Sequence, residues 1–105
     1  MSDTTMKSLQ YVVIIASQKK REKFLSLLND FGVRMINTVY GHGSMSPSAL
    51  AAAFGLEAEQ GKVLITCLVP TDKARTLMEV LYRDYHFDKP NTGIAFSVSV
   101  EGLAF

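Results

Sequence analysis

Two segments of this sequence would carry apolar side chains on both sides if they were extended. This feature restricts the possible folds more than any other. Successive residues of a strand point to opposite faces of a sheet. In Leu9–Ser17 and in Lys62–Pro70, both alternating sets are rich in Val, Ile and Leu. These segments are therefore predicted to be strands that need apolar contacts on both faces of one sheet.

The whole pattern predicts a single domain, residues 1–105, with the order strand, helix, strand, strand, helix, strand. Ser17 is expected to cap a first helix that ends at Gly32, and Thr71 to cap a second. Residues 33–41 and 94–100 are the other two predicted strands. This order is typical of the ferredoxin-like βαββαβ sandwich, an α+β fold in which two helices cover one face of an antiparallel four-stranded sheet. The first and third strands are then central. The buried stripe of the second helix is predicted to be Ala74, Leu77, Met78, Leu81 and Tyr85.

The fourth predicted strand alternates between apolar and small polar residues. Its apolar face, expected to be buried, is Ile94, Phe96, Val98 and Val100, and its other face is Ala95, Ser97, Ser99 and Glu101. Because two helices cover only one face of the sheet, the middle of the second face should be an apolar patch. We expect further copies of the chain to cover this patch. The alternative is cover by loops or by the C-terminal residues 103–105.

Charge balance and cysteine content exclude several classes of function. Eleven Lys and Arg residues face ten Asp and Glu residues, so no strong field attracts nucleic acid or an anionic membrane. The single cysteine, Cys67, rules out an internal disulfide and is expected in the core. Residues 1–8 are expected to be flexible and lack a signal-peptide pattern, and no apolar run approaches the roughly 20 residues that span a bilayer. We therefore expect a cytoplasmic protein without direct membrane insertion.

No catalytic or metal-binding constellation stands out in the sequence. The two histidines, His42 and His86, lie in separate predicted loops and have no partner at metal-ligand spacing. The sequence also contains no nucleophile elbow, no phosphate-loop lysine signature and no acid pair of readable spacing. The chain is therefore not expected to be an enzyme.

Two glycine-bearing loops are the remaining candidates for ligand contact. Gly41 and Gly43 follow the second predicted strand, and Asn91, Thr92 and Gly93 precede the fourth, with Lys89 nearby. Glycine lets the backbone approach a bound group and point amides at it. Each motif alone is usually a turn, but together the two loops can converge across a subunit boundary into one cleft.

These loops and the last strand resemble those of the nitrogen-regulatory PII signalling family, and of its short, divergent members in particular. The resemblance extends from Leu9 to Val100 and is carried by "VYGHGS", "LYRDYHFDKPNTG" and "GIAFSVSVEGL". It implies a homotrimer with an adenine nucleotide, ATP, ADP or AMP, in each cleft between subunits. It also implies a regulatory role in signal transduction, in which the loop between the second and third strands contacts a target protein such as an enzyme or transporter.

The resemblance assigns ligand contact to residues of both loops. It places Gly41 and Gly43 where the family's loop touches the nucleotide, and Asn91, Thr92 and Gly93 on the family's phosphate-binding loop. With their neighbours in this sequence, the candidate nucleotide-binding residues are Gly41, His42, Gly43, Ser44, Lys89, Asn91, Thr92 and Gly93. The chain departs from the family at Ile94, where a lysine commonly follows the last loop glycine. Residues 44–61 replace the family's long flexible loop and are predicted to be shortened and partly helical, with Pro47 early in the helix and Gly55 at its end.

Two other functions remain open at this point. One is a divalent-cation-handling trimer of the same fold, against which the single cysteine and the scattered histidines argue. The other is an amino-acid-binding regulatory domain that pairs through its edge strands and forms a dimer. The mass of the assembly separates the dimer from the trimers.

Overall fold

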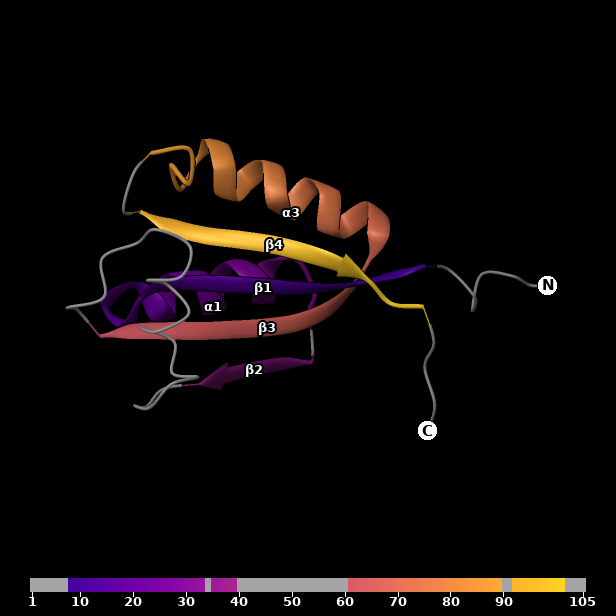
Figure 1. Cartoon of the computed structure of the whole chain (residues 1–105), viewed down its shortest axis with the longest axis horizontal. Coiled ribbons are helices and arrows are strands. Elements are labelled where there is room, and N and C mark those ends of the chain that lie inside the picture. The colour runs from indigo at the N-terminus through magenta and orange to yellow at the C-terminus, as the bar shows by residue number, and fades with distance from the viewer. Residues whose placement is uncertain (1–7, 34, 40–60, 90–91, 102–105) are drawn as a thin grey trace.

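A four-stranded antiparallel sheet forms the centre of the molecule (Figure 1). The computed structural model describes residues 8–33, 35–39, 61–89 and 92–101. In their order across the sheet, the strands are β2 (Ile36–Val39), β3 (Lys62–Pro70), β1 (Leu9–Ser17) and β4 (Gly93–Ser99). The prediction of an antiparallel sheet with the first and third strands at its centre is confirmed.

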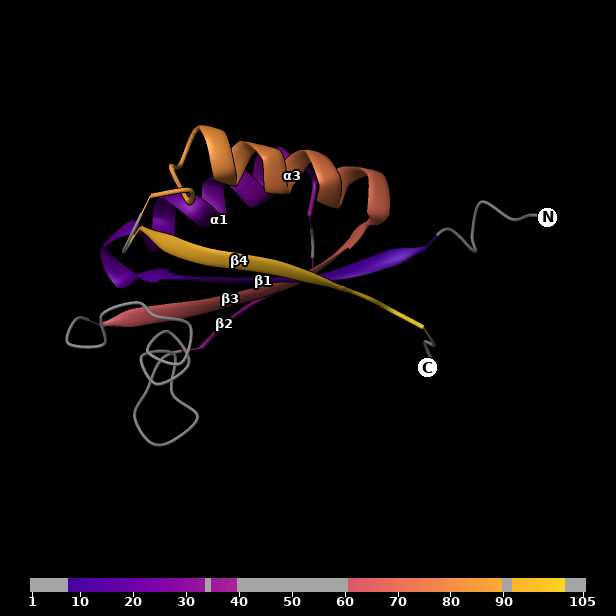
Figure 2. The same cartoon turned by 45° about the horizontal axis from the view of Figure 1, so that its top comes forward.

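Two helices pack on one face of this sheet, as Figure 2 shows. A short 3₁₀ helix, η2 (Gln18–Lys20), leads into α1 (Arg21–Asp30), and α3 (Thr71–Arg83) follows β3 directly. The predicted ferredoxin-like α+β architecture is therefore confirmed. The predicted helix of residues 44–61 lies outside the described residues, except for Gly61, whose carbonyl accepts a hydrogen bond from the Gln18 amide at 3.1 Å.

The main core lies between the helices and the sheet. Register places Ile14 beside Ile65 and Val12 beside Cys67, so these four side chains share the face that the helices cover. The predicted stripe of α3 is confirmed for Ala74, Leu77 and Leu81 and for the half-buried Met78. Tyr85 is also half-buried against the core, but it lies beyond the end of α3 at Arg83, so its assignment to the helix is wrong. The core consists of Val12, Ile14, Ala16, Phe24, Leu27, Leu28, Val33, Val63, Ile65, Cys67, Val69, Ala74, Leu77 and Leu81.

The helix ends follow the expected local chemistry at two of three positions. The Ser17 hydroxyl oxygen accepts a hydrogen bond from the Lys19 amide at 3.3 Å, which caps the first helical segment as predicted. Gly32 has a φ of 76° and donates its amide to the Asn29 carbonyl, which ends α1. The prediction that Thr71 caps the second helix is wrong. Pro70 holds the cap position, and the Thr71 hydroxyl donates to the Ser8 carbonyl instead.

The apolar side of β4 lies on the face of the sheet that the helices leave uncovered. Val13 and Ile15 of β1 pair with Phe96 and Ile94, and these four residues form a second cluster with Leu64. The small residues Ala95, Ser97 and Ser99 share the helix-covered face. The expectation that the whole apolar side of this strand is buried is therefore wrong for Val98, which is 53% exposed. The reason is topological, because β4 turns its apolar side away from the two helices.

Candidate functional site

The two loops singled out in the sequence are attached to the same end of the sheet. At that end, Lys62 lies beside Ser17, and Gly93 lies beside Ala16. Val39, the last residue of β2, lies beside Leu64. The first loop therefore leaves β2 and the second enters β4 at one shared end. Gly41, His42, Gly43, Ser44 and Asn91 themselves lie outside the described residues.

Within one chain, the two loop attachments lie on opposite edges of the sheet. Val39 ends one edge strand and Gly93 begins the other, with β3 and β1 between them. Neighbouring strands lie about 4.8 Å apart, so three strand spacings amount to roughly 14 Å. The two loop attachments thus lie at the same end of the sheet, but within one chain they are too far apart for direct contact.

Gly93 is explained by packing against an aromatic ring. A Cβ at Gly93 would lie 2.6 Å from the Phe87 ring. Phe87 is held in place by an edge-on contact with Phe24, with ring centroids 5.7 Å apart. Its amide donates to the Leu81 carbonyl at 3.1 Å, and His86 before it has a φ of 63°. The absence of a side chain at Gly93 therefore makes room for Phe87.

The other described residues of the second loop are Lys89 and Thr92. The Lys89 amide donates to the His86 carbonyl at 2.9 Å and so closes a turn. Its side chain is exposed and pairs with no carboxylate among the described residues. Thr92 is half-buried. The site therefore offers one cation, Lys89, close in sequence to the start of β4.

A cavity of about 280 Å³ lies beside Gly93, between α3 and the start of β4. Sequence reasoning missed it. The sequence feature that could have indicated this cavity is Tyr82, an aromatic residue outside the predicted buried stripe of α3. In the structure Tyr82 is 62% exposed. None of the lining residues is charged, so the cavity suits a flat, weakly polar group. They are Met78, Leu81, Tyr82, Phe87, Gly93, Ile94 and Ala95.

Metal and thiol chemistry find little support in the part of the chain that the structure describes. There, no three His, Cys, Asp or Glu side chains gather closely enough to hold a metal ion. Cys67 is in the core as predicted, and burial raises the pKa of its thiol to about 11. At neutral pH the thiol stays protonated, which makes it a weak nucleophile. None of the described helices is long and apolar enough to cross a membrane.

Comparison with known proteins identifies the fold. No protein-family model matches the sequence, and no curated protein sequence matches it either. Among solved structures, the chain is similar to the apo form of CPII from Thiomonas intermedia K12, a nitrogen regulatory PII-like protein. The TM-score is 0.66, the identity is 18%, and 89% of each chain is covered.

Two further structures were solved with nucleotides. CPII bound to ADP, AMP and acetate matches with a TM-score of 0.62 and 20% identity over 91% of each chain. The B. subtilis GlnK–ATP complex matches with a TM-score of 0.57 and 20% identity, over 89% of this chain and 82% of GlnK. The chain therefore has the fold of the PII-like nitrogen regulatory proteins.

Proposed function

We propose that this protein is a PII-like regulator that assembles as a homotrimer, binds an adenine nucleotide between subunits and modulates a partner protein in the cytoplasm. The observation that carries the proposal is the apolar sheet face opposite the helices, in a chain with the PII-like fold. By analogy with the family, the role is regulatory rather than catalytic.

The open face, defined as the side of the sheet opposite α1 and α3, carries apolar residues on all four strands, and its middle row also contains the polar residues Asn37 and Thr66. In register, one row across the sheet runs from Val39 through Leu64 and Ile15 to Ile94. A second row contains Leu68, Tyr11 and Val98. Tyr11 and Val39 are both 41% exposed. Val13 and Ile15 at the centre of this face are buried within the single chain, so its exposed apolar side chains include Tyr11, Val39 and Val98. Exposed apolar patches mark interaction sites, which supports cover of this face by further copies of the chain.

The end of the sheet near Gly93 supports a nucleotide site. It combines the apolar cavity lined by Tyr82 and Phe87 with the exposed cation of Lys89. A purine base needs a flat apolar surface, and a phosphate needs a cation or backbone amides. Because the loop attachments of one chain are roughly 14 Å apart, we propose that the Gly41–Ser44 loop and the Lys89–Gly93 loop of neighbouring subunits meet on one nucleotide. The nucleotides bound to CPII and GlnK agree with this ligand class.

Light scattering and calorimetry test the two parts separately. We expect a solution mass of three times the 11.6 kDa of one chain. A mass of a single chain at low concentration would overturn the assembly, and a mass of two chains would favour the edge-paired amino-acid-binding domain. Calorimetric titration of ATP, ADP and AMP should show binding of at least one. A stable trimer that binds none of them would disprove the nucleotide site and leave the assembly standing.

Lys89→Ala locates the site. Loss of a hydrogen bond to a charged group should weaken nucleotide binding by about tenfold or more. The matched control is Lys73→Ala, because Lys73 is also exposed but lies in the first turn of α3, beside Ser8 at the opposite end of the sheet. Equal affinities of the two variants would show that Lys89 does not contact the nucleotide.

A further inference from the structure

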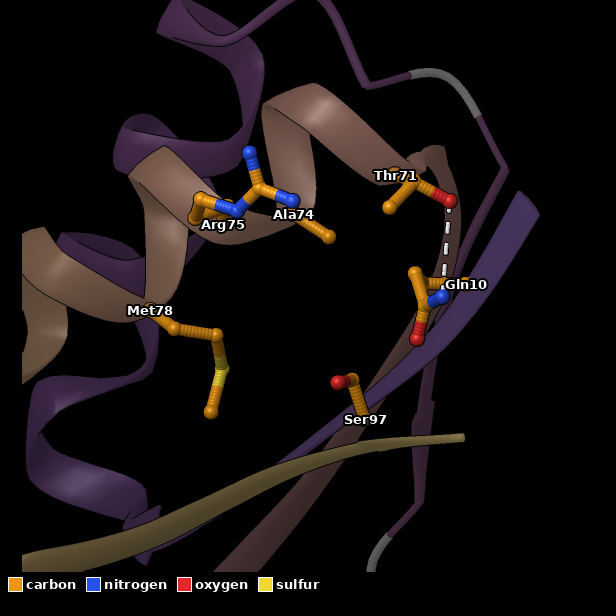
Figure 3. A pocket seen from close by; sticks show the side chains of 6 residues that line it. All are labelled: Gln10, Thr71, Ala74, Arg75, Met78 and Ser97. Atoms are coloured by element: carbon orange, nitrogen blue, oxygen red, sulfur yellow. Dashed lines mark hydrogen bonds between the residues drawn. The ribbon is translucent and has the colours of Figure 1, made fainter. Parts of the chain in front are cut away.

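A second cavity, about 210 Å³ in volume, lies at the other end of α3 (Figure 3). In the figure, Ala74, Arg75 and Met78 of α3 line one side, Gln10 and Ser97 come from β1 and β4, and Thr71 lies at the start of the helix. Gln10 pairs with Ser99, whereas Gly93 pairs with Ala16. Six residues of strand separate these positions, or roughly 20 Å. This cavity is thus distinct from the proposed nucleotide site.

The small side chains of β4 create this cavity. Ser97 lies beside Val12, and Ser99 lies beside Gln10, on the face that the helices cover. A large apolar residue at position 97 would fill the space under Ala74 and Met78, as the Val and Ile residues of β1 and β3 do elsewhere in the core. A serine leaves the space open and adds a hydroxyl.

Hydrogen bonds fix the polar wall of the cavity before any ligand arrives. Gln10 Nε2 donates to Ser99 Oγ at 3.2 Å and more weakly to Thr71 Oγ1 at 3.4 Å. Thr71 Oγ1 in turn donates to the Ser8 carbonyl at 3.1 Å. These bonds hold the Gln10 side chain with its Oε1 turned away from Thr71 (Figure 3). Oε1 is therefore an oriented acceptor.

One of the lining residues, Arg75, is a cation, and no other lining residue neutralises its charge. None of the six lining residues carries a carboxylate, although Asp72 lines an adjoining cavity of about 320 Å³ together with Thr71 and Arg75. Arg75 is exposed and forms no ion pair with a described residue, and the Ser97 hydroxyl likewise has no hydrogen-bond partner among them. A guanidinium matches the geometry of a carboxylate, to which it can donate two parallel hydrogen bonds. The lining thus combines an anion-binding group, an acceptor and the apolar wall of Ala74 and Met78.

We propose that this cavity binds a small α-hydroxy or α-amino carboxylate. The carboxylate pairs with Arg75 and accepts from the Ser97 hydroxyl. The adjacent hydroxyl or ammonium group donates to Gln10 Oε1, and the remaining carbon chain lies against Met78. The volume is below the roughly 300–1,000 Å³ of sites for drug-sized ligands, which limits the ligand to a small molecule. The site is on the helix side of the sheet, so it stays open whether or not the open face is covered.

Three probes that differ only at the α-carbon test this assignment. L-lactate, L-alanine and propionate share the carboxylate and chain length, but only the first two carry a donor for Gln10. Titrations followed by amide chemical shifts should show L-lactate or L-alanine shifting the signals of Thr71–Met78 and Ser97, and the difference between the two identifies the donor. Propionate should bind about tenfold more weakly, because it leaves Gln10 Oε1 unpaired. No shift with any probe at millimolar concentration would overturn the site, and equal binding of propionate would overturn the role of Gln10.

Matched variants complete the test. Arg75→Ala should weaken binding of the probe at least about tenfold. Arg83→Ala should leave the affinity unchanged, since Arg83 is also exposed on α3 but does not line the cavity. Ser97→Val should abolish binding by filling the space, whereas Thr38→Val on the exposed edge strand β2 should not. Equal losses in the two arginine variants would indicate unspecific charge attraction and would disprove the site. These experiments depend neither on the mass of the oligomer nor on nucleotides. A failure of the carboxylate site can therefore be told apart from a failure of the proposed function.

Discussion

Phe87 lies so close to Gly93 that no other residue fits at this position without a shift of the ring. A Cβ at Gly93 would come within 2.6 Å of the ring, and Phe24 supports the same ring in an edge-on contact. Gly93→Ala should therefore lower the free energy of unfolding by about 1–3 kcal/mol, the usual cost of overpacking. Thermal and urea denaturation measure this change.

Gly61→Ala is the control for that variant. There, the nearest atoms to an added Cβ belong to the flexible end of the Gln18 side chain, at 3.1 Å, which can move aside. The control should cost clearly less stability than Gly93→Ala. Equal costs would mean that the tight contact with Phe87 is not the reason for glycine at position 93.

The open face should be sensitive to charge in the assembly but not in the single chain. Val98 is 53% exposed in one chain, so Val98→Lys should change the stability of an isolated chain by no more than about 0.5 kcal/mol. In an assembly that buries this face, the same charge would be desolvated, and the trimer should dissociate. Sedimentation analysis of Val98→Lys measures this. The control is Thr76→Lys, which adds the same charge to the exposed side of α3 and should leave the trimer intact. A trimer that survives Val98→Lys would place the interface elsewhere.

Lys73 links the two helices through one hydrogen bond. Its Nζ donates at 3.0 Å to the carbonyl of Phe31, which follows the last residue of α1. A cation at a helix C-terminus contributes about 0.3–1 kcal/mol at an exposed position. Lys73→Met keeps the aliphatic stem and should lower stability by this amount in urea denaturation, and high salt should shrink the difference. Lys19→Met, a change at another exposed lysine, should have no comparable effect.

The buried thiol of Cys67 should make stability fall at alkaline pH. Burial raises the pKa of this thiol from 9.0 to about 11, so the folded state holds its proton where the unfolded state has released it. The stability that the buried thiol contributes is fully present below pH 9.0 and is lost as the pH rises from there to about 11. Urea denaturation of the native chain and of Cys67→Ala between these pH values isolates the effect. The native chain should lose stability more steeply, and parallel curves would contradict the assignment.

Much of the fold follows from local patterns that a linear chain displays directly. The runs Leu9–Ser17 and Lys62–Pro70 are central strands because their apolar residues occupy both alternating sets. The stripe of α3 and the stop at Gly32 follow from helical spacing and from the freedom of glycine to adopt a positive φ. Such features depend on neighbours within a few residues, so the sequence alone determined them.

Register and packing decided the rest. The alternation of β4 predicted two unlike sides, but only its pairing with β1 assigned Phe96 to the open face and Ser97 to the helix face. The position of Thr71 inside α3 instead of at its cap likewise depends on a contact with Ser8, 63 residues away in the sequence. Both of these cavities lie between α3 and the sheet strands beside it, and residues that are distant in the chain line each of them. A sequence encodes which residues are apolar or polar, whereas the space between them exists only after distant segments have packed together.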